Sequence, residues 1–110
     1  MSQDNWPSGP TETTDLVVVS GGVRLAVRDF GGDGRALVFV HGGPGPNLAS
    51  WDSFAARMAG PFRAIAYDLR GHGQSDDAED YSYDALAGDI EVIVQALHLN
   101  EPIVVGHSWW

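Results

Sequence analysis

The stretch ALVFVHGGPG (residues 36–45) decides the fold of this 110-residue chain. Its first five residues are all apolar, and a strand without a polar face is typical of a parallel sheet that is covered on both sides. A glycine-rich turn follows at once, and its unshielded backbone N–H groups can bind a phosphate or an oxyanion. A phosphate loop would need a lysine, and the sequence contains none. The turn therefore indicates either an oxyanion site or a plain tight turn.

Strands and helices alternate around this stretch. LVVVS (16–20) and VRLAVRDF (23–30) are separated by two glycines, which predicts a hairpin of antiparallel strands. Further along the chain we expect a helix over 50–59 that begins near Ser50 or Asp52, a buried strand over 62–68, a helix over 83–98 with Ser82 as its N-cap, and a buried strand over 103–105. The order β-β-β-α-β-α-β indicates an α/β fold in which a mostly parallel sheet follows two antiparallel strands.

The chain is long enough for one domain, which we place at residues 15–110 after a disordered polar tail over residues 1–14. The tail lacks the apolar core of a signal peptide, and no segment reaches the about 18 consecutive apolar residues of a membrane span. Because the sequence contains no cysteine, it can form no disulfide, thiolate metal site or cysteine nucleophile. We expect a cytoplasmic protein.

The formal net charge of −9 argues against nucleic acid and against an anionic membrane as partners, since both need a basic surface. Seven of the 15 acidic residues lie between Asp76 and Glu91. We interpret this segment as a solvated face, and a docking site for a cationic partner is the alternative.

The segment VVGHS (104–108) places a serine directly after the last predicted strand. Gly106 and Ser108 fit the start of the pattern G-x-S-x-G, a strained turn between a strand and a helix that exposes a nucleophilic serine. Trp110 stands where the second small residue of that pattern is expected. Taken alone, the segment also fits an ordinary loop serine.

The segment YDLRGHGQS (67–75) follows the strand predicted over 62–68. A metal site formed by Asp68 and His72 would need a second group of ligands, and the spacing offers none, so we expect no metal. We expect Asp68 and Arg70 to hold this loop in place through hydrogen bonds.

Together, a buried strand ending in HGGPG, a strand ending in D-x-R-G-x-G-x-S and a strand ending in G-H-S closely resemble the N-terminal half of the α/β-hydrolase fold. The resemblance covers about residues 16–109. It is strongest to the branch of proline iminopeptidases, small esterases, and epoxide and haloalkane hydrolases. A serine at position 108, where the last two groups usually carry aspartate, implies acyl transfer on ester, amide or peptide substrates.

The resemblance implies a role for each motif. Ser108 would be the nucleophile, and the backbone N–H groups of Gly43 and Trp109 would form the oxyanion hole. His41 would support its loop, and Asp68 and Arg70 would support theirs. The family strand order is 1-2-4-3-5, and no cofactor is implied.

The triad acid and base of this family follow the serine, and only two residues follow Ser108 here. None of His41, His72, His98 and His107 is suited to act as the base. We therefore expect the front part of a small-molecule ester or amide hydrolase, cut at the nucleophile turn, inactive alone and with an open apolar edge. The alternatives are one chain of a split hydrolase, completed by a C-terminal chain, and a non-catalytic binding module that uses the acidic segment.

Overall fold

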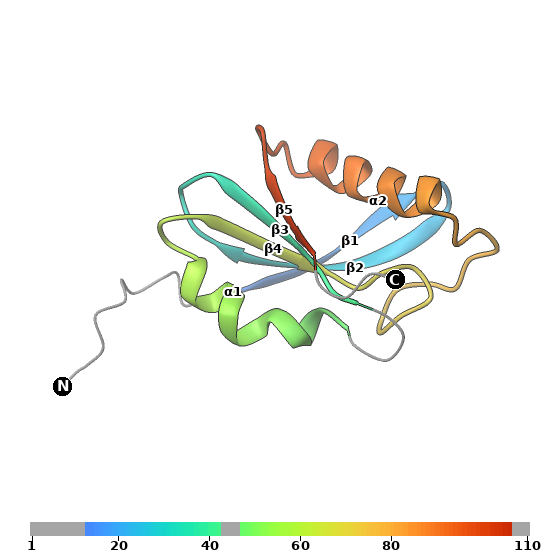
Figure 1. Cartoon of the computed structure of the whole chain (residues 1–110), viewed down its shortest axis with the longest axis horizontal. Coiled ribbons are helices and arrows are strands. Elements are labelled where there is room, and N and C mark those ends of the chain that lie inside the picture. Colours follow the sequence, from blue (N-terminus) through green and yellow to red (C-terminus); the bar gives the residue numbers. More distant parts are fainter. Residues whose placement is uncertain (1–12, 43–46, 107–110) are drawn as a thin grey trace.

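The computed structural model describes residues 13–42 and 47–106 of the chain, which form a five-stranded sheet with helices on both faces (Figure 1). The strands are β1 (Thr14–Ser20), β2 (Val23–Gly31), β3 (Ala36–Val40), β4 (Arg63–Tyr67) and β5 (Ile103–Gly106). The helices are the 3-10 turn η1 (Leu48–Trp51), α1 (Asp52–Met58) and α2 (Tyr83–Ala96).

The strand order is β1-β2-β4-β3-β5, which confirms the order that the resemblance implies. β1 and β2 form the predicted hairpin, and β2 also pairs antiparallel with β4. β3 pairs parallel with both β4 and β5. The hairpin turns at Gly21 and Gly22, whose φ angles of 54° and 85° suit glycine far better than other residues.

β3 is buried along its whole length, as its continuous apolar run predicts. Val38 and Val40 belong to the cluster on the α2 face, and Leu37 and Phe39 belong to the cluster on the α1 face. In Figure 1, α2 (orange) lies over one face of the sheet and α1 (green) lies over the other. The chain therefore forms a three-layer α/β arrangement with a mixed sheet in the middle.

Helix α2 follows its sequence signals closely. The side chain of Ser82 accepts a hydrogen bond from the N–H of Ala85 at 3.2 Å and caps the N-terminus, as predicted. Ile93 is fully buried against the sheet. The helix ends at Ala96, two residues before the predicted boundary, and the exposed His98 follows in a left-handed conformation with φ 55°.

The first helical segment begins with the 3-10 turn η1, whose cap Asn47 accepts from the N–H of Ala49 at 3.0 Å. The α-helix itself, α1, begins at Asp52, which is one of the two expected starts, and ends at Met58, one residue before the predicted boundary.

The strand expected over 103–105 is β5 (Ile103–Gly106), and the expectation that it is buried was wrong, because Val104 is 47% exposed. The open apolar edge that was also expected is present among the described strands. Within the described residues β3 is the one strand that pairs with β5, so one side of β5 is open.

The tail expected over residues 1–14 lies almost entirely outside the described residues, and β1 already begins at Thr14. Among the described helices, α2 is the longest at 14 residues, and none is long and apolar enough to cross a membrane.

Candidate active site

The carboxyl ends of β3, β4 and β5 meet at one edge of the sheet. Val40 at the end of β3 pairs with Tyr67 of β4 on one side and with Gly106 of β5 on the other. The next residues along the first two strands are His41 and Asp68, which are 1% and 2% exposed. Ligand sites of open α/β sheets lie outside the carboxyl ends of the strands, so this edge is the candidate site.

Both ring nitrogens of His41 form hydrogen bonds with backbone groups. The N–H of Leu69 donates to Nε2 at 3.0 Å, so the ring proton lies on Nδ1 and is donated to the carbonyl of Gly42 at 2.5 Å. Burial lowers the pKa of His41 below its ordinary value. A neutral imidazole with two fixed partners supports the loop and has no free nitrogen for a substrate proton.

His72 lies beside this group, with its ring centroid 5.3 Å from that of His41. Its Nδ1 lies 3.0 Å from the carbonyl of Arg70. The side chain is held by the loop that contains it, and it faces the buried imidazole.

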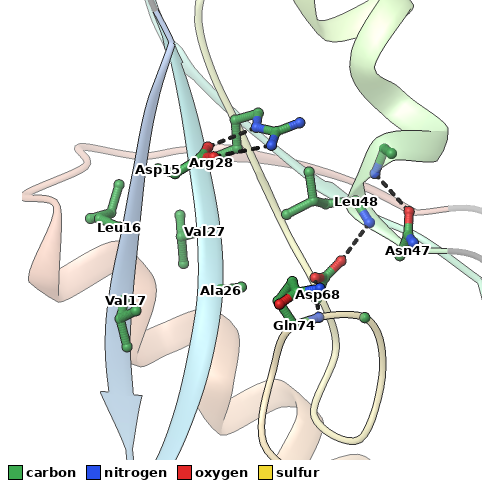
Figure 2. A pocket seen from close by; sticks show the side chains of 12 residues that line it. Asp15, Leu16, Val17, Ala26, Val27, Arg28, Asn47, Leu48, Asp68 and Gln74 are labelled. Atoms are coloured by element: carbon green, nitrogen blue, oxygen red, sulfur yellow. Dashed lines mark hydrogen bonds and ion pairs between the residues drawn. The ribbon is translucent and has the colours of Figure 1, made fainter.

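Asp68 joins three segments of the chain (Figure 2). Its Oδ1 accepts from the N–H of Leu48 at 2.7 Å, and its Oδ2 accepts from the N–H of Gln74 at 2.8 Å. Its backbone carbonyl accepts from the hydroxyl of Ser75 at 2.6 Å. A Cβ atom added at Gly73, where φ is 51°, would overlap the Asp68 carboxylate, so both the space and the conformation there require glycine.

Arg70 forms a two-pronged ion pair with Asp89 of helix α2, with both N–O distances at 2.7 Å. Its third contact is the carbonyl of Asp80 at 2.8 Å. Asp89 is fully buried, and its hydrogen bonds raise the pKa of Arg70. The pair fastens the loop after β4 to the helix that covers the sheet.

The solvated-face interpretation of the acidic segment was therefore wrong for one of its members, Asp89, which is buried against Arg70. Asp76 forms an ion pair with Arg24 in which both side chains stay partly exposed. Asp89 is the site residue that sequence reasoning missed. The available signal was its position on the same helical face as Ile93, four residues further on, which is the face that packs on the sheet.

A cavity of about 330 Å³ lies beside this network, between the β1–β2 hairpin and the start of η1 (Figure 2). Arg28 on its wall pairs with Asp15 at 2.7 Å and with Asp52 at 3.1 Å. The guanidinium is thus neutralised by two carboxylates, and the rest of the wall is mostly apolar.

The predicted nucleophile Ser108 and the predicted oxyanion-hole residues Gly43 and Trp109 lie outside the described residues. Gly106, two residues before the serine, is the last described residue and ends β5 at the candidate site. Within residues 13–42 and 47–106 no group of three His, Asp or Glu side chains is arranged to hold a metal ion.

Comparison with known proteins establishes the family. The sequence model of the alpha/beta hydrolase fold matches residues 35–109, and the chain belongs to this family. The fold seen here corresponds to part of it.

Several relatives share this part. Non-heme chloroperoxidase CPO-A1 of Kitasatospora aureofaciens is 38% identical over 88 residues, which are 79% of this chain and 32% of that protein. Epoxide hydrolase 1 of Caenorhabditis elegans is 36% identical over 91 residues, which are 79% of this chain and 22% of that protein. The chain spans about a sixth to a third of the length of these curated relatives and others like them.

Solved structures of several enzymes superimpose on this fold. A crystal structure of an N-formylmaleamic acid deformylase from Pseudomonas putida S16 superimposes with a TM-score of 0.75 and 30% identity, over 86% of this chain and 37% of that one. The epoxide hydrolase VrEH1 of Vigna radiata gives a TM-score of 0.76 and 30% identity, over 88% of this chain and 32% of that one. The branch of the family to which this chain is nearest stays a prediction.

Proposed function

We propose that this chain carries the nucleophile part of a serine hydrolase that acts on small ester or amide substrates. The observation that supports it is the meeting of β3, β4 and β5 at one edge, with β5 leading through Gly106 toward Ser108. In this fold a serine on the turn after that strand has the right position for a nucleophile.

In the proposed reaction, Oγ of Ser108 attacks the substrate carbonyl carbon and its proton passes to a base. The oxyanion that forms is stabilised by the backbone N–H groups of Gly43 and Trp109. The alcohol or amine leaves with a proton, and water then hydrolyses the acyl-serine ester and regenerates the hydroxyl.

We do not assign the base to either histidine at the site. Both ring nitrogens of His41 form hydrogen bonds to backbone groups, and Nδ1 of His72 lies against the carbonyl of Arg70. In this family the base follows the serine in the chain, and both histidines precede it. We therefore propose that this chain has little or no turnover by itself, because a serine hydroxyl without a base is a poor nucleophile at neutral pH.

The test uses p-nitrophenyl acetate and the full 110-residue chain. We expect no turnover by the chain alone. We expect turnover after mixing it with the part of the Kitasatospora aureofaciens chloroperoxidase that follows the matched region, because that part would supply the missing groups.

The Ser108→Ala variant should abolish this turnover, and Ser53→Ala, which removes an exposed hydroxyl on α1, should leave it unchanged. Turnover that survives Ser108→Ala, or a mixture that binds but does not react, would refute the proposed nucleophile.

One observation favours the split-hydrolase alternative, in which a C-terminal chain completes the enzyme. An apolar groove of about 260 Å³ lies between α2 and β5, and its wall includes Leu86, Ile90 and Val104. It adjoins the open side of β5, so a partner could pair with the strand and fill the groove. Val104→Asp should prevent complementation, whereas Val19→Asp should not, although Val19 on β1 is 57% exposed and Val104 is 47% exposed.

A further inference from the structure

We propose that the cavity between the β1–β2 hairpin and η1 binds a small organic cation, an apolar group that carries one ammonium. Binding there does not depend on the proposed hydrolysis. Three features of the described residues support it: a hairpin face that no described helix covers, apolar walls, and carboxylates in excess around a single guanidinium.

The floor of the cavity is the face of the hairpin that points away from α2. Residues two apart on a strand share a face, and Asp15 and Val17 are such a pair on β1. Opposite them on β2 lie Arg28 and Ala26. Val18, between the two on β1, belongs instead to the cluster under α2. Val17 is 60% exposed, so within the described residues no helix covers this part of the face and a ligand can reach it.

The walls suit one small apolar group. The cavity has a volume of about 330 Å³, at the lower end of the range of about 300–1,000 Å³ for small-molecule sites. Leu48 of η1 and Ala26 of β2 line it with apolar side chains. In Figure 2, Leu48 lies between the Asp15–Arg28 pair and the side chain of Asp68, so the apolar part of the wall has charged groups on either side.

Carboxylates outnumber cations around this space. Arg28 pairs with Asp15 at 2.7 Å and with Asp52 at 3.1 Å, so one guanidinium faces two carboxylates. Both acids stay accessible, with 65% and 44% of their side-chain surface exposed. Asp68 adds a third carboxylate, and among the described residues that line the cavity Arg28 is the one basic side chain. The resulting potential favours a cation and disfavours an anion.

The carboxylates also keep acceptor capacity for an ammonium group. An ionised carboxylate can accept about four hydrogen bonds, and Asp15 accepts two from Arg28, at 2.7 and 3.1 Å. Asp52 likewise accepts two from the same guanidinium. The hydrogen bond with Asp15 raises the pKa of Arg28, and that with Arg28 lowers the pKa of Asp15, so this pair stays ionised near pH 7. An ammonium can therefore join the group without breaking it.

The first test titrates the full 110-residue chain with three probes of similar shape and follows amide cross-peaks by NMR. The probes are 2-phenylethylammonium, the uncharged 2-phenylethanol and the anion phenylacetate. We expect the ammonium to shift the signals of Ala26 and Leu48 with a Kd on the order of 1 mM, about fivefold tighter than the alcohol, and phenylacetate to bind most weakly. Equal affinity for ammonium and alcohol, stronger binding of phenylacetate, or no binding of any probe would overturn the proposal.

The second test compares Asp15→Asn with Asp33→Asn. Asp33 is a matched control, because it is an exposed acid in the turn between β2 and β3 that does not line the cavity, and its replacement changes the net charge equally. Asp15→Asn should weaken ammonium binding about fivefold and leave the alcohol within about twofold, and Asp33→Asn should change neither. Equal weakening in both variants would show that overall charge attracts the probe, which contradicts a site at the hairpin.

The third test fills the cavity with Ala26→Leu, which should abolish binding of both the ammonium and the alcohol. The hydrogen bonds of Ala26 to Ser75 and Asp68 use its backbone, so the new side chain leaves them in place. Unchanged binding would place the ligand elsewhere and overturn the proposal. If this variant does not fold, salt decides with the natural sequence: raising NaCl from about 20 to about 300 mM should weaken ammonium binding about threefold and spare the alcohol, and no salt effect would contradict the role of the carboxylates.

Discussion

Asp68 and Asp89 are both buried carboxylates beside the loop that follows β4, and the chain stabilises them in different ways. Asp68 is surrounded by backbone N–H groups, from Leu48 and Gln74. Asp89 faces the guanidinium of Arg70. The first arrangement fixes the course of the backbone at the candidate site, and the second fastens a loop to a helix. A buried aspartate therefore fixes local backbone geometry where its donors are backbone N–H groups, and joins distant elements where its donor is a guanidinium.

Among the changes predicted here, removing the Asp89 carboxylate should lower the free energy of unfolding most. Asp89→Ala leaves the Arg70 guanidinium without its buried partner, and we expect the free energy of unfolding to fall by about 3–5 kcal/mol. Urea unfolding followed by tryptophan fluorescence measures it. The double variant Arg70→Met/Asp89→Leu removes both charges and should recover most of that loss, and a double variant as unstable as the single one would refute this account.

Replacing Asp68 should lower the free energy of unfolding by a smaller amount. Asp68→Asn keeps one of two backbone hydrogen bonds, and we expect a loss of about 1–3 kcal/mol from the donor left unsatisfied. The same urea experiment measures it. A loss as large as that of Asp89→Ala would remove the distinction between the two carboxylates.

Burial of His41 should make the stability of the folded chain depend on pH. Burial lowers its pKa in the folded chain, whereas the unfolded imidazole titrates near its ordinary value of about 6.5. As the pH falls below that value, the unfolded state takes up a proton that the folded state does not, so the free energy of unfolding decreases.

Urea midpoints at several values between pH 7.5 and pH 5 should fall for the natural sequence, and His41→Gln should show a shallower slope. The exposed His98→Gln serves as the control for loss of an imidazole. The lowered pKa values of Asp15 and Asp76 act only in the acid range below about 4. Equal slopes in the natural sequence and His41→Gln would show that burial of this ring is not linked to stability.

Removing the exposed ion pair Arg24–Asp76 should change the stability of the fold least. Both side chains are solvated, with 70% and 33% of their surface exposed, and surface ion pairs contribute little. We expect Arg24→Gln to leave the urea midpoint within experimental error, at low and at high salt. A clear destabilisation would mean that charge pairing matters as much at the surface as at Asp89.

Local signals in the sequence were sufficient for much of the fold. The apolar run of β3 predicted burial on both sides, the two glycines predicted the hairpin, and Ser82 predicted the start of α2. The strand order came from the family resemblance, which three short motifs carried together.

The features that sequence reasoning missed depend on contacts between distant segments. Arg70 and Asp89 are 19 residues apart and meet only because α2 packs on the sheet, so no local pattern marks the pair. The 3-10 turn η1 and its cap Asn47 were not predicted, because the sequence signals there marked only the start of α1 near Asp52. The exposure of β5 depends on which strands lie beside it, and an apolar run such as Ile103–Val105 cannot tell one neighbour from two.

The two edges of the sheet differ, because β1 bounds it as the outer strand of an antiparallel hairpin and β5 bounds it as a parallel strand. Within the described residues each edge has one strand neighbour. If copies of the chain joined by pairing β1 of one with β5 of the next, the contact would be head-to-tail and would leave a free edge at each end. Such a contact has no two-fold symmetry, so self-association through this pairing would give a ring or an open filament and not a two-fold dimer.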